Sequence, residues 1–166
     1  MKDERLLEKC RKIKIVISDV DGVLTDGGMY YSSKGEELKK FNTRDGMAVE
    51  LLSKNQVNVI LMSKENSKIV LFRAKKIQAI KYYIGISKKE EKLSEICKEF
   101  SVTPEEIAYI GDDINDLAIM KKIGFSVSPN NGIKEIKKES DYVCELNGGE
   151  GVLREVADLI IFAKRQ

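Results

Sequence analysis

The chain has 166 residues, of which 42% are hydrophobic and 34% charged, and its formal net charge is +2 at pH 7. These values are typical of one soluble globular domain, and the charge is too small to indicate nucleic acid or an acidic membrane surface as a partner. No apolar run approaches the ~20 residues of a membrane span, and the first residues lack the apolar core of a signal peptide, so we expect a cytoplasmic protein.

The residue types present restrict the chemistry. The sequence contains no histidine, which excludes Ser-His-Asp triads, phosphohistidine chemistry and histidine-ligated zinc. The cysteines are few, odd in number and far apart, which suits a reducing compartment. A cysteine phosphatase needs an arginine shortly after its nucleophile, and the residues at that spacing are Val16, Thr103 and Glu150. Catalysis must therefore depend on carboxylates, lysines and hydroxyls.

The first third of the chain predicts a helix, a strand and a hairpin. A short polar helix over residues 3–12 precedes an apolar strand that ends at residue 18. Two strand-like runs around a Ser/Gly turn then predict a β-hairpin inserted at about residues 28–42. The hairpin aromatics could form a satellite core or a subunit interface, and they are Tyr30, Tyr31 and Phe41.

The rest of the chain alternates helices with apolar strands. The predicted strands are residues 57–62, 80–84, 107–110, 124–127 and 142–144. The predicted helices are residues 43–54, 67–76, 88–100, 114–122, 132–138 and a C-terminal helix after Gly151. Nearly continuous apolar strands between helices indicate a parallel sheet that is covered on both faces. We therefore expect one α/β domain over residues 1–166, with a Rossmann-like, doubly wound, mainly parallel sheet.

Charged and hydroxyl side chains follow the carboxyl ends of several of these strands. Ligands of parallel sheets bind beyond those ends. They are Asp19, Asp21, Ser63, Lys89, Asp112, Asp113 and Asp116. Each alone has an ordinary explanation, since Gly-Asp-Asp is usually a turn, a lone lysine lies on the surface and a serine caps a helix. Their order along the chain instead predicts an oxygen-lined magnesium site beside a cation.

Four blocks match, in order, the motifs of the haloacid dehalogenase superfamily of aspartate-nucleophile phosphatases, which the chain resembles. They are Asp19-Val20-Asp21-Gly22-Val23, Ser63, Lys89 and Gly111-Asp112-Asp113. The stretches 21–27, 41–46, 108–113 and 148–155 further resemble the 3-deoxy-D-manno-octulosonate 8-phosphate phosphatase family, which includes relatives acting on nine-carbon ulosonate 9-phosphates. The resemblance covers about residues 12–164 and implies that there is no separate cap domain.

The resemblance implies a Mg²⁺-dependent phosphomonoesterase with an aspartyl-phosphate intermediate. Asp19 would be the nucleophile and a metal ligand, and Asp21 would be the acid and base that gives the metal its main-chain carbonyl. Asp112 would complete the metal site, while Asp113 or Asp116 would hold metal-bound water or orient Lys89. Lys89 and Ser63 would bind the transferring phosphoryl oxygens.

The resemblance also implies a sugar-acid phosphate as substrate and a role in lipopolysaccharide biosynthesis. The expected substrate contacts are Asn42, Thr43, Arg44, Asp45, Gly46, Glu65, Arg73, Lys76, Lys89 and Arg154. An ordinary capped helix explains residues 42–46 equally well. Glu50 and Glu65 stand where octulosonate phosphatases usually carry arginines. Glu65 with Arg73 and Lys76 looks more like the branch that acts on deoxynonulosonate 9-phosphates.

Assembly and two other classes of protein complete the expectations. The family is typically a homotetramer with paired hairpins, in which a neighbour's C-terminal segment closes the site. We therefore expect a C-terminal lid and helix at about residues 147–166, with residues 148–151 as a flexible hinge. A non-catalytic module related to sugar cytidylyltransferase C-terminal domains need not retain Asp19, Asp21, Lys89 and Asp112 together. A two-component receiver domain would carry its acidic pair before the phosphoacceptor strand.

Overall fold

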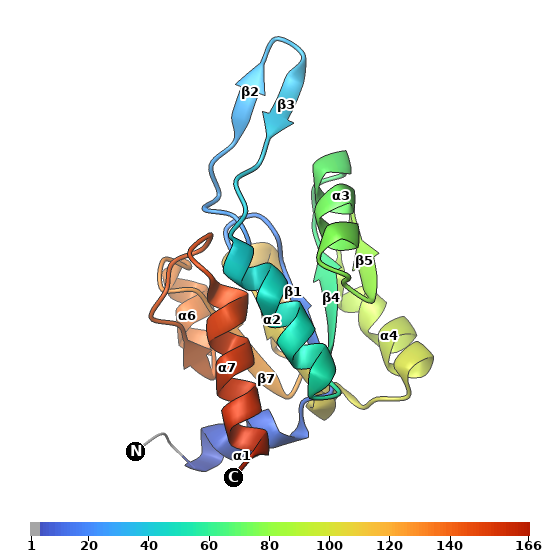
Figure 1. The fold of residues 1–166 in the computed structure, drawn as a ribbon, viewed down its shortest axis with the longest axis vertical. Helices are drawn as coiled ribbons and strands as arrows, with labels where there is room; N and C mark the ends of the chain where they lie inside the picture. The colour runs from blue at the N-terminus through green and yellow to red at the C-terminus, as the bar shows by residue number, and fades with distance from the viewer. Residues whose placement is uncertain (1–3) are drawn as a thin grey trace.

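A six-stranded parallel sheet forms the centre of the computed structural model, which describes residues 4–166 (Figure 1). The strand order is β5-β4-β1-β6-β7-β8. Its strands are β1 (Ile15–Ser18), β4 (Asn58–Met62), β5 (Lys81–Tyr83), β6 (Ile107–Ile110), β7 (Phe125–Ser128) and β8 (Tyr142–Val143). The chain runs outward from β1 to β5 and then returns to β6. Ligands bind at such a reversal, beyond the carboxyl ends of the strands.

Helices cover both faces of this sheet, as the sequence predicts. One face packs against α1 (Glu4–Lys12), α2 (Thr43–Lys54), α3 (Lys68–Lys76) and α7 (Val152–Lys164). The other face packs against α4 (Leu93–Phe100), α5 (Leu117–Met120) and α6 (Lys134–Glu139). Within β1, Val16 belongs to the first core, whereas Ile15 and Ile17 belong to the second. This alternation follows from the two-residue period of a strand.

Three short 3₁₀ helices interrupt this pattern: η1 (Lys89–Lys92), η2 (Pro104–Glu106) and η3 (Ile114–Asp116). The sequence predicts one continuous helix over residues 88–100 and another over 114–122. In the structure, each of them begins with a 3₁₀ turn, and α5 ends at Met120. Residue 3, the first of the predicted N-terminal helix, lies outside the described residues.

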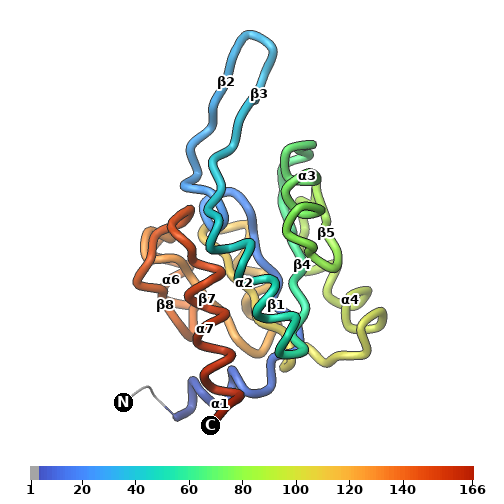
Figure 2. The backbone as a smooth tube through the Cα atoms, viewed as in Figure 1, coloured from blue at the N-terminus to red at the C-terminus, as the bar shows by residue number. Residues whose placement is uncertain are grey.

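The predicted hairpin is present and projects away from the sheet (Figures 1 and 2). Its strands β2 (Tyr30–Ser32) and β3 (Gly35–Leu38) pair in antiparallel fashion, with a register shift between Tyr30 and Tyr31. Both tyrosines are exposed. Phe41 differs from them, because it packs against the larger core and the Arg73 guanidinium lies 5.2 Å from its ring centroid. Of the two alternatives for the aromatics, Phe41 therefore agrees with packing against a core, whereas the exposed tyrosines leave an interface open.

The glycine-rich segment 148–151 is bound to the loop that follows β1. The Gly149 amide donates to the Val23 carbonyl over 2.9 Å, and Asn42 Nδ2 donates to the Gly149 carbonyl over 3.2 Å. A Cβ atom on Gly148 would lie 1.9 Å from the Gly22 carbonyl oxygen. Two stretches of backbone are thus in direct contact there, and the expected hinge motion of this segment stays a prediction.

The C-terminal helix α7 packs along α2 and α1, and the chain ends at the opposite end of the molecule from the hairpin (Figure 1). None of the helices in residues 4–166 is long and apolar enough to cross a membrane. None of these residues forms a separate cap domain over the sheet (Figure 2). The expected fold class is therefore confirmed.

Ser101, which ends α4, provides a test of the local backbone. Its φ of 53° and ψ of 48° lie in the left-handed region, where a Cβ atom is unfavourable. We expect Ser101→Gly to raise the free energy of unfolding by about 1 kcal/mol in urea titrations. The matched change Lys98→Gly, at an exposed position inside the same helix, should lower it by about 1 kcal/mol. Destabilisation by both changes would contradict the left-handed assignment.

Candidate active site

The loops that follow β1, β4 and β6 meet at the carboxyl edge of the sheet. They enclose a pocket of about 200 Å³. The pocket is lined by Asp19, Asp21, Lys64, Glu65, Asp112, Asp113 and Asn115. The structure thus brings together, as predicted, the acidic residues that follow β1 and β6.

A buried lysine links two of the aspartates. Lys89 Nζ lies 2.9 Å from Asp19 Oδ1 and 2.6 Å from Asp116 Oδ1, and the lysine side chain has no exposed surface. Burial alone would lower the pKa of Lys89, but attraction to Asp19 and Asp116, together with its hydrogen bonds, raises this pKa above its ordinary value. Lys89 is therefore a fixed positive charge in contact with Asp19, which lines the pocket.

Asp116 orients this lysine and the turn beside it. Its Oδ1 also accepts a hydrogen bond from the Tyr109 hydroxyl over 2.6 Å. Its Oδ2 accepts from the amides of Asp112 and Asp113, over 3.0 and 3.4 Å. A Cβ atom on Gly111 would lie 2.5 Å from the Asp116 Cβ, so only glycine allows this close approach. Both Asp116 oxygens are engaged by the protein, which favours an orienting role.

Three carboxylates form a group that suits a divalent cation. Single oxygens of Asp19, Asp112 and Asp116 lie within 4.8 Å of one another. Burial, followed by repulsion from Asp116, raises the pKa of Asp19 well above its ordinary value and the pKa of Asp112 to about 7. Asp112 Oδ1 is buried and has no hydrogen-bond partner among the described residues. Oxygen ligands with uncompensated negative charge are what Mg²⁺ requires, so Asp19 and Asp112 fit the metal, while Asp116 adds negative charge beside them and orients Lys89.

Room for this group depends on a glycine after β1. Gly22 has a φ of +87°, and a Cβ atom there would lie 2.0 Å from Asp112 Oδ2. The missing side chain therefore allows the carboxylate of one loop to lie against the backbone of another.

Asp21 and Asp113 are placed apart from the three carboxylates. Asp21 Oδ1 lies 2.6 Å from Lys39 Nζ, and its Oδ2 accepts from Ser63 Oγ over 3.5 Å. Asp113 is exposed, and its Oδ1 accepts from the Ile114 amide over 2.6 Å, which caps η3. Asp113 thus caps the 3₁₀ helix while it lines the pocket, and of the two aspartates expected to orient Lys89 it is Asp116 that contacts the lysine. The expected contact of Asp113 with metal-bound water stays a prediction.

Lys39 is the residue of this site that the sequence did not reveal. It belongs to the pair Lys39-Lys40 at the end of the hairpin, which looks like a solvated surface. Its side chain is nevertheless fully buried, and Nζ also lies 2.6 Å from Glu36 Oε1. Burial alone would lower its pKa, but bonds to Asp21 and Glu36 raise it, so Lys39 is a cation.

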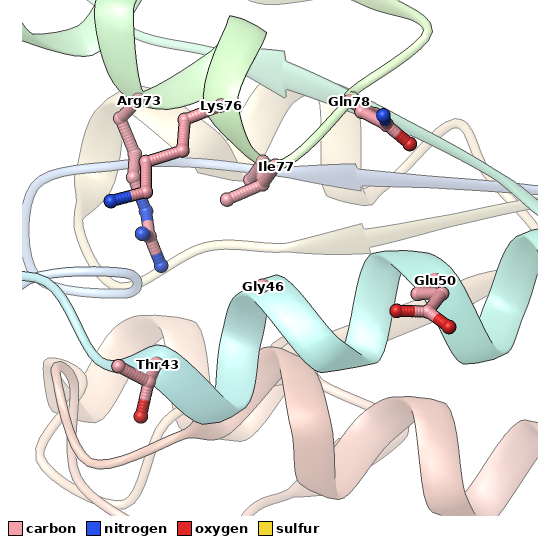
Figure 3. A pocket seen from close by; sticks show the side chains of 7 residues that line it. All are labelled: Thr43, Gly46, Glu50, Arg73, Lys76, Ile77 and Gln78. Carbon is pink, nitrogen blue, oxygen red and sulfur yellow. The ribbon is translucent and has the colours of Figure 1, made fainter.

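The expected substrate contacts are divided among three places. Glu65 lines the catalytic pocket. A second pocket of about 360 Å³ lies between α2 and α3, and Figure 3 shows its lining side chains. These are Thr43, Gly46, Glu50, Arg73, Lys76, Ile77 and Gln78. Arg44 and Arg154 line a third pocket, where Arg154 Nε lies 2.9 Å from Asp158 Oδ1.

Asn42 and Asp45 hold the protein together and do not line these pockets. Asn42 caps α2 by accepting from the Arg44 amide over 2.9 Å, and its carbonyl accepts from Arg73 Nη2 over 2.7 Å. Asp45 is buried, and its Oδ1 accepts from the Arg154 amide at the start of α7 over 3.2 Å. Their polar atoms thus bind other parts of the chain, and their expected substrate contacts stay predictions.

The comparisons with known proteins agree with this geometry. Residues 11–156 match the family of haloacid dehalogenase-like hydrolases. The 3-deoxy-D-manno-octulosonate 8-phosphate phosphatase of Salmonella typhi is 35% identical over 159 residues, which cover 96% of this chain and 85% of that protein.

Two solved structures are similar over nearly the whole chain. The 3-deoxy-D-manno-octulosonate 8-phosphate phosphatase of Moraxella catarrhalis, in complex with magnesium ion, phosphate ion and a KDO molecule, superposes with a TM-score of 0.94 at 33% identity. The comparison covers 99% of this chain and 94% of that one. The cobalt-bound octulosonate 8-phosphate phosphatase of Haemophilus influenzae gives 0.92 at 36% identity, covering 95% and 92%.

Asp45 should make the stability of the protein depend on pH. Burial raises its pKa from 3.8 to about 6, against the opposing bond from the Arg154 amide and the attraction of Arg73. Between these two values the folded state binds more protons than the unfolded state, so the free energy of unfolding falls as the pH rises, by at most about 3 kcal/mol. We expect Asp45→Asn to reduce the measured fall by this amount, in urea titrations from about pH 4 to about pH 7, while the part that comes from the other carboxylates with raised pKa values remains.

The matched control for this experiment is Asp158→Asn, which changes an exposed carboxylate of α7. This control should retain the wild-type dependence on pH. An Asp45→Asn protein whose stability falls with pH as steeply as that of the wild type would show that another group is responsible.

Proposed function

The chain belongs to the haloacid dehalogenase-like hydrolases, within the family of 3-deoxy-D-manno-octulosonate 8-phosphate phosphatases, and from this premise we propose that it hydrolyses 3-deoxy-D-manno-octulosonate 8-phosphate through an aspartyl-phosphate. The observation that carries the proposal is that Asp19 and Asp21, which are separated by one residue, have different contacts. Asp19 lies in the carboxylate group against Lys89, whereas the Asp21 carboxylate is held outside it.

Asp19 is the nucleophile in this proposal. Lys89 fixes its Oδ1 at 2.9 Å, which orients the carboxylate in the pocket. Attack by an Asp19 oxygen forms a bond to phosphorus and breaks the bond between phosphorus and the sugar oxygen. The covalent intermediate divides one difficult hydrolysis into two easier steps.

Asp21 transfers the protons in both steps. It first gives a proton to the departing sugar oxygen, which leaves as an alcohol. As a carboxylate it then takes a proton from the water that attacks phosphorus, and the bond between phosphorus and Asp19 breaks. Free phosphate leaves, and both aspartates return to their starting forms.

We propose Mg²⁺ as the cofactor, held by the carboxylates of Asp19 and Asp112 and by the main-chain carbonyl of Asp21. When bound, the metal offsets the repulsion between the carboxylate nucleophile and the phosphate. The partnerless Asp112 Oδ1 and the raised pKa values of the group support this assignment. The magnesium and phosphate ions of the Moraxella catarrhalis complex support it as well.

Lys89 and Ser63 bind the phosphoryl oxygens. Lys89 uses two of its three N–H groups on Asp19 and Asp116, which leaves one for a phosphoryl oxygen. Ser63 follows β4, and its Oγ lies 3.5 Å from Asp21 Oδ2 and accepts from the Glu65 amide over 3.1 Å. Its hydroxyl thus lies beside the acid and base.

A nine-carbon substrate is the second candidate, because Glu65 lines the catalytic pocket. A carboxylate there repels the carboxylate of a sugar acid and instead accepts hydrogen bonds from sugar hydroxyls. An arginine, which octulosonate phosphatases usually carry at that position, would instead attract the carboxylate of the sugar acid. A deoxynonulosonate 9-phosphate therefore belongs in the same substrate panel.

We also propose a homotetramer of single-domain protomers that pair through their hairpins. Four large hydrophobic side chains, Met29, Tyr30, Tyr31 and Leu38, are between 47% and 65% exposed on or beside the hairpin. Several large apolar side chains exposed on one projecting element are typical of a subunit interface. The free cysteines agree with a cytoplasmic location, and the proposed product agrees with a role in lipopolysaccharide biosynthesis.

Hydrolysis is tested by phosphate release from a panel that contains the eight-carbon and nine-carbon ulosonate phosphates. We expect release from the eight-carbon substrate and complete loss with EDTA. Asp19→Asn should abolish turnover, and Asp21→Asn should lower kcat by about 10²- to 10⁴-fold, which is the usual contribution of general acid–base catalysis. Full activity of Asp19→Asn would refute the mechanism, and a preference for the nine-carbon substrate would favour the second candidate.

The assembly is tested by light scattering coupled to size-exclusion chromatography. We expect a tetramer for the wild type and smaller species for the double variant Tyr31→Ser/Leu38→Ser, because both side chains lie exposed on the hairpin. Ile80→Ser, which changes an exposed hydrophobic residue just before β5, serves as the control and should remain tetrameric. A monomeric wild type would exclude the proposed assembly.

A further inference from the structure

Lys39 connects the hairpin to the site of proton transfer. It directly follows β3, between the exposed side chains of Leu38 and Lys40. Its own side chain turns inward and has no exposed surface. The Nζ atom lies 2.6 Å from Asp21 Oδ1 and 2.6 Å from Glu36 Oε1.

Only two of the lysines that form ion pairs among the described residues have fully buried side chains, Lys39 and Lys89. Each of them contacts one of the two aspartates that follow β1. Burying an ammonium group costs several kcal/mol, and an apolar side chain of similar volume is often as stabilising or more so. Attachment of the hairpin to the sheet therefore does not require a charge at residue 39.

The contacts of Asp21 indicate a role for the positive charge of Lys39. Oδ1 is held by the lysine at 2.6 Å, whereas Oδ2 has only the 3.5 Å contact with Ser63 Oγ. Asp21 also lines the catalytic pocket, yet its carboxylate is absent from the three-carboxylate group. One oxygen is thus fixed, and the other is available to a ligand.

We propose that Lys39 is a positioning residue for Asp21: it fixes one carboxylate oxygen, keeps the carboxylate away from the metal site, and leaves the other oxygen free for proton transfer. This inference rests on the proposed phosphatase function and adds a residue to it. Lys39 acts through Asp21 and has no direct contact with the reacting atoms.

Glu36 orients the lysine and extends the connection to α3. Its Oε1 faces Lys39, and its Oε2 accepts from Ser67 Oγ, which precedes α3, over 3.3 Å. Through Glu36, strand β3 is thereby tied to the loop that follows β4, and through Lys39 the end of the hairpin is tied to the loop that follows β1. Glu36 is therefore the second positioning residue, one step further from the reaction.

Without Lys39, the Asp21 carboxylate is free to rotate toward a Mg²⁺ ion bound at Asp19 and Asp112. A carboxylate bound to a metal is a poor proton donor and acceptor, so both chemical steps slow. Substrate binding changes little, because the buried lysine does not line the pocket. The expected signature is a loss in kcat with KM retained.

The first test measures kcat and KM on the substrate panel. Lys39→Met should lower kcat by about 10- to 100-fold with KM unchanged within about twofold, and Lys39→Arg should restore part of the loss. Glu36→Gln should lower kcat less than Lys39→Met. Lys40→Met, which changes an adjacent lysine whose side chain is 69% exposed, is the matched control and should behave as the wild type. A change confined to KM would overturn the proposal.

The second test does not need hydrolysis. Isothermal titration with Mg²⁺ alone gives Kd for the wild type, Lys39→Met, Asp21→Asn and the double variant. Lys39→Met should tighten Mg²⁺ binding by about fivefold more in the wild-type background than in the Asp21→Asn background, because only a free carboxylate can reach the metal. Equal tightening in both backgrounds reflects only the lost charge and would overturn the proposal.

These two tests separate the inference from the proposed function. If the wild type releases phosphate from no member of the panel, the proposed function fails, and the metal titrations still decide the role of Lys39. Thermal melts verify that each variant is folded. If Lys39→Met does not fold, the same Mg²⁺ titrations are made with Glu36→Gln, alone and combined with Asp21→Asn. They then test whether the contact between Lys39 and Asp21 controls metal binding.

Discussion

The ion pair between Lys89 and Asp19 is the interaction on which the site depends. Asp116 accepts from the same lysine at 2.6 Å and also binds the turn that carries Asp112, so one ammonium group holds two loops and a 3₁₀ helix in a fixed relation. Two charges buried this deeply are costly unless they are paired, and this cost makes the arrangement specific. The parallel sheet brings the three segments together, and the lysine sets their distances.

The sheet and the carboxylate group were predictable, because both follow from short-range patterns. Nearly continuous apolar strands between helices indicate a covered parallel sheet, and the acidic residues lie directly after two of those strands. Lys39 was not predictable in this way. It stands in the mostly polar run Glu36-Glu37-Leu38-Lys39-Lys40, and only the fold of the hairpin shows that its side chain turns inward while that of Lys40 stays outside.

Three of the predicted site residues also have a structural partner, and their predicted contacts with ligands stay predictions. Asn42, Asp45 and Asp113 carry the polar side chains that often bind ligands. Each of them accepts a hydrogen bond from a backbone amide at the start of a helix. Unpaired amides at helix starts occur in every such protein, and a carboxylate or amide side chain beside one is used there first. The sequence gives the polar side chain but does not tell which backbone amide lies beside it. Ligand binding and helix capping therefore cannot be distinguished until the positions of the helices are known.

The contact between Gly22, Asp112 and Gly148 has a consequence for sequence drift. The Asp112 carboxylate occupies the volume on one side of Gly22, and Gly148 lies against the Gly22 carbonyl on the other. A side chain at residue 22 or 148 therefore collides with a partner that is distant in sequence, and no single compensating change relieves both collisions. A segment exchanged with a relative therefore preserves the pocket only when that relative also carries glycine at the positions of residues 22 and 148.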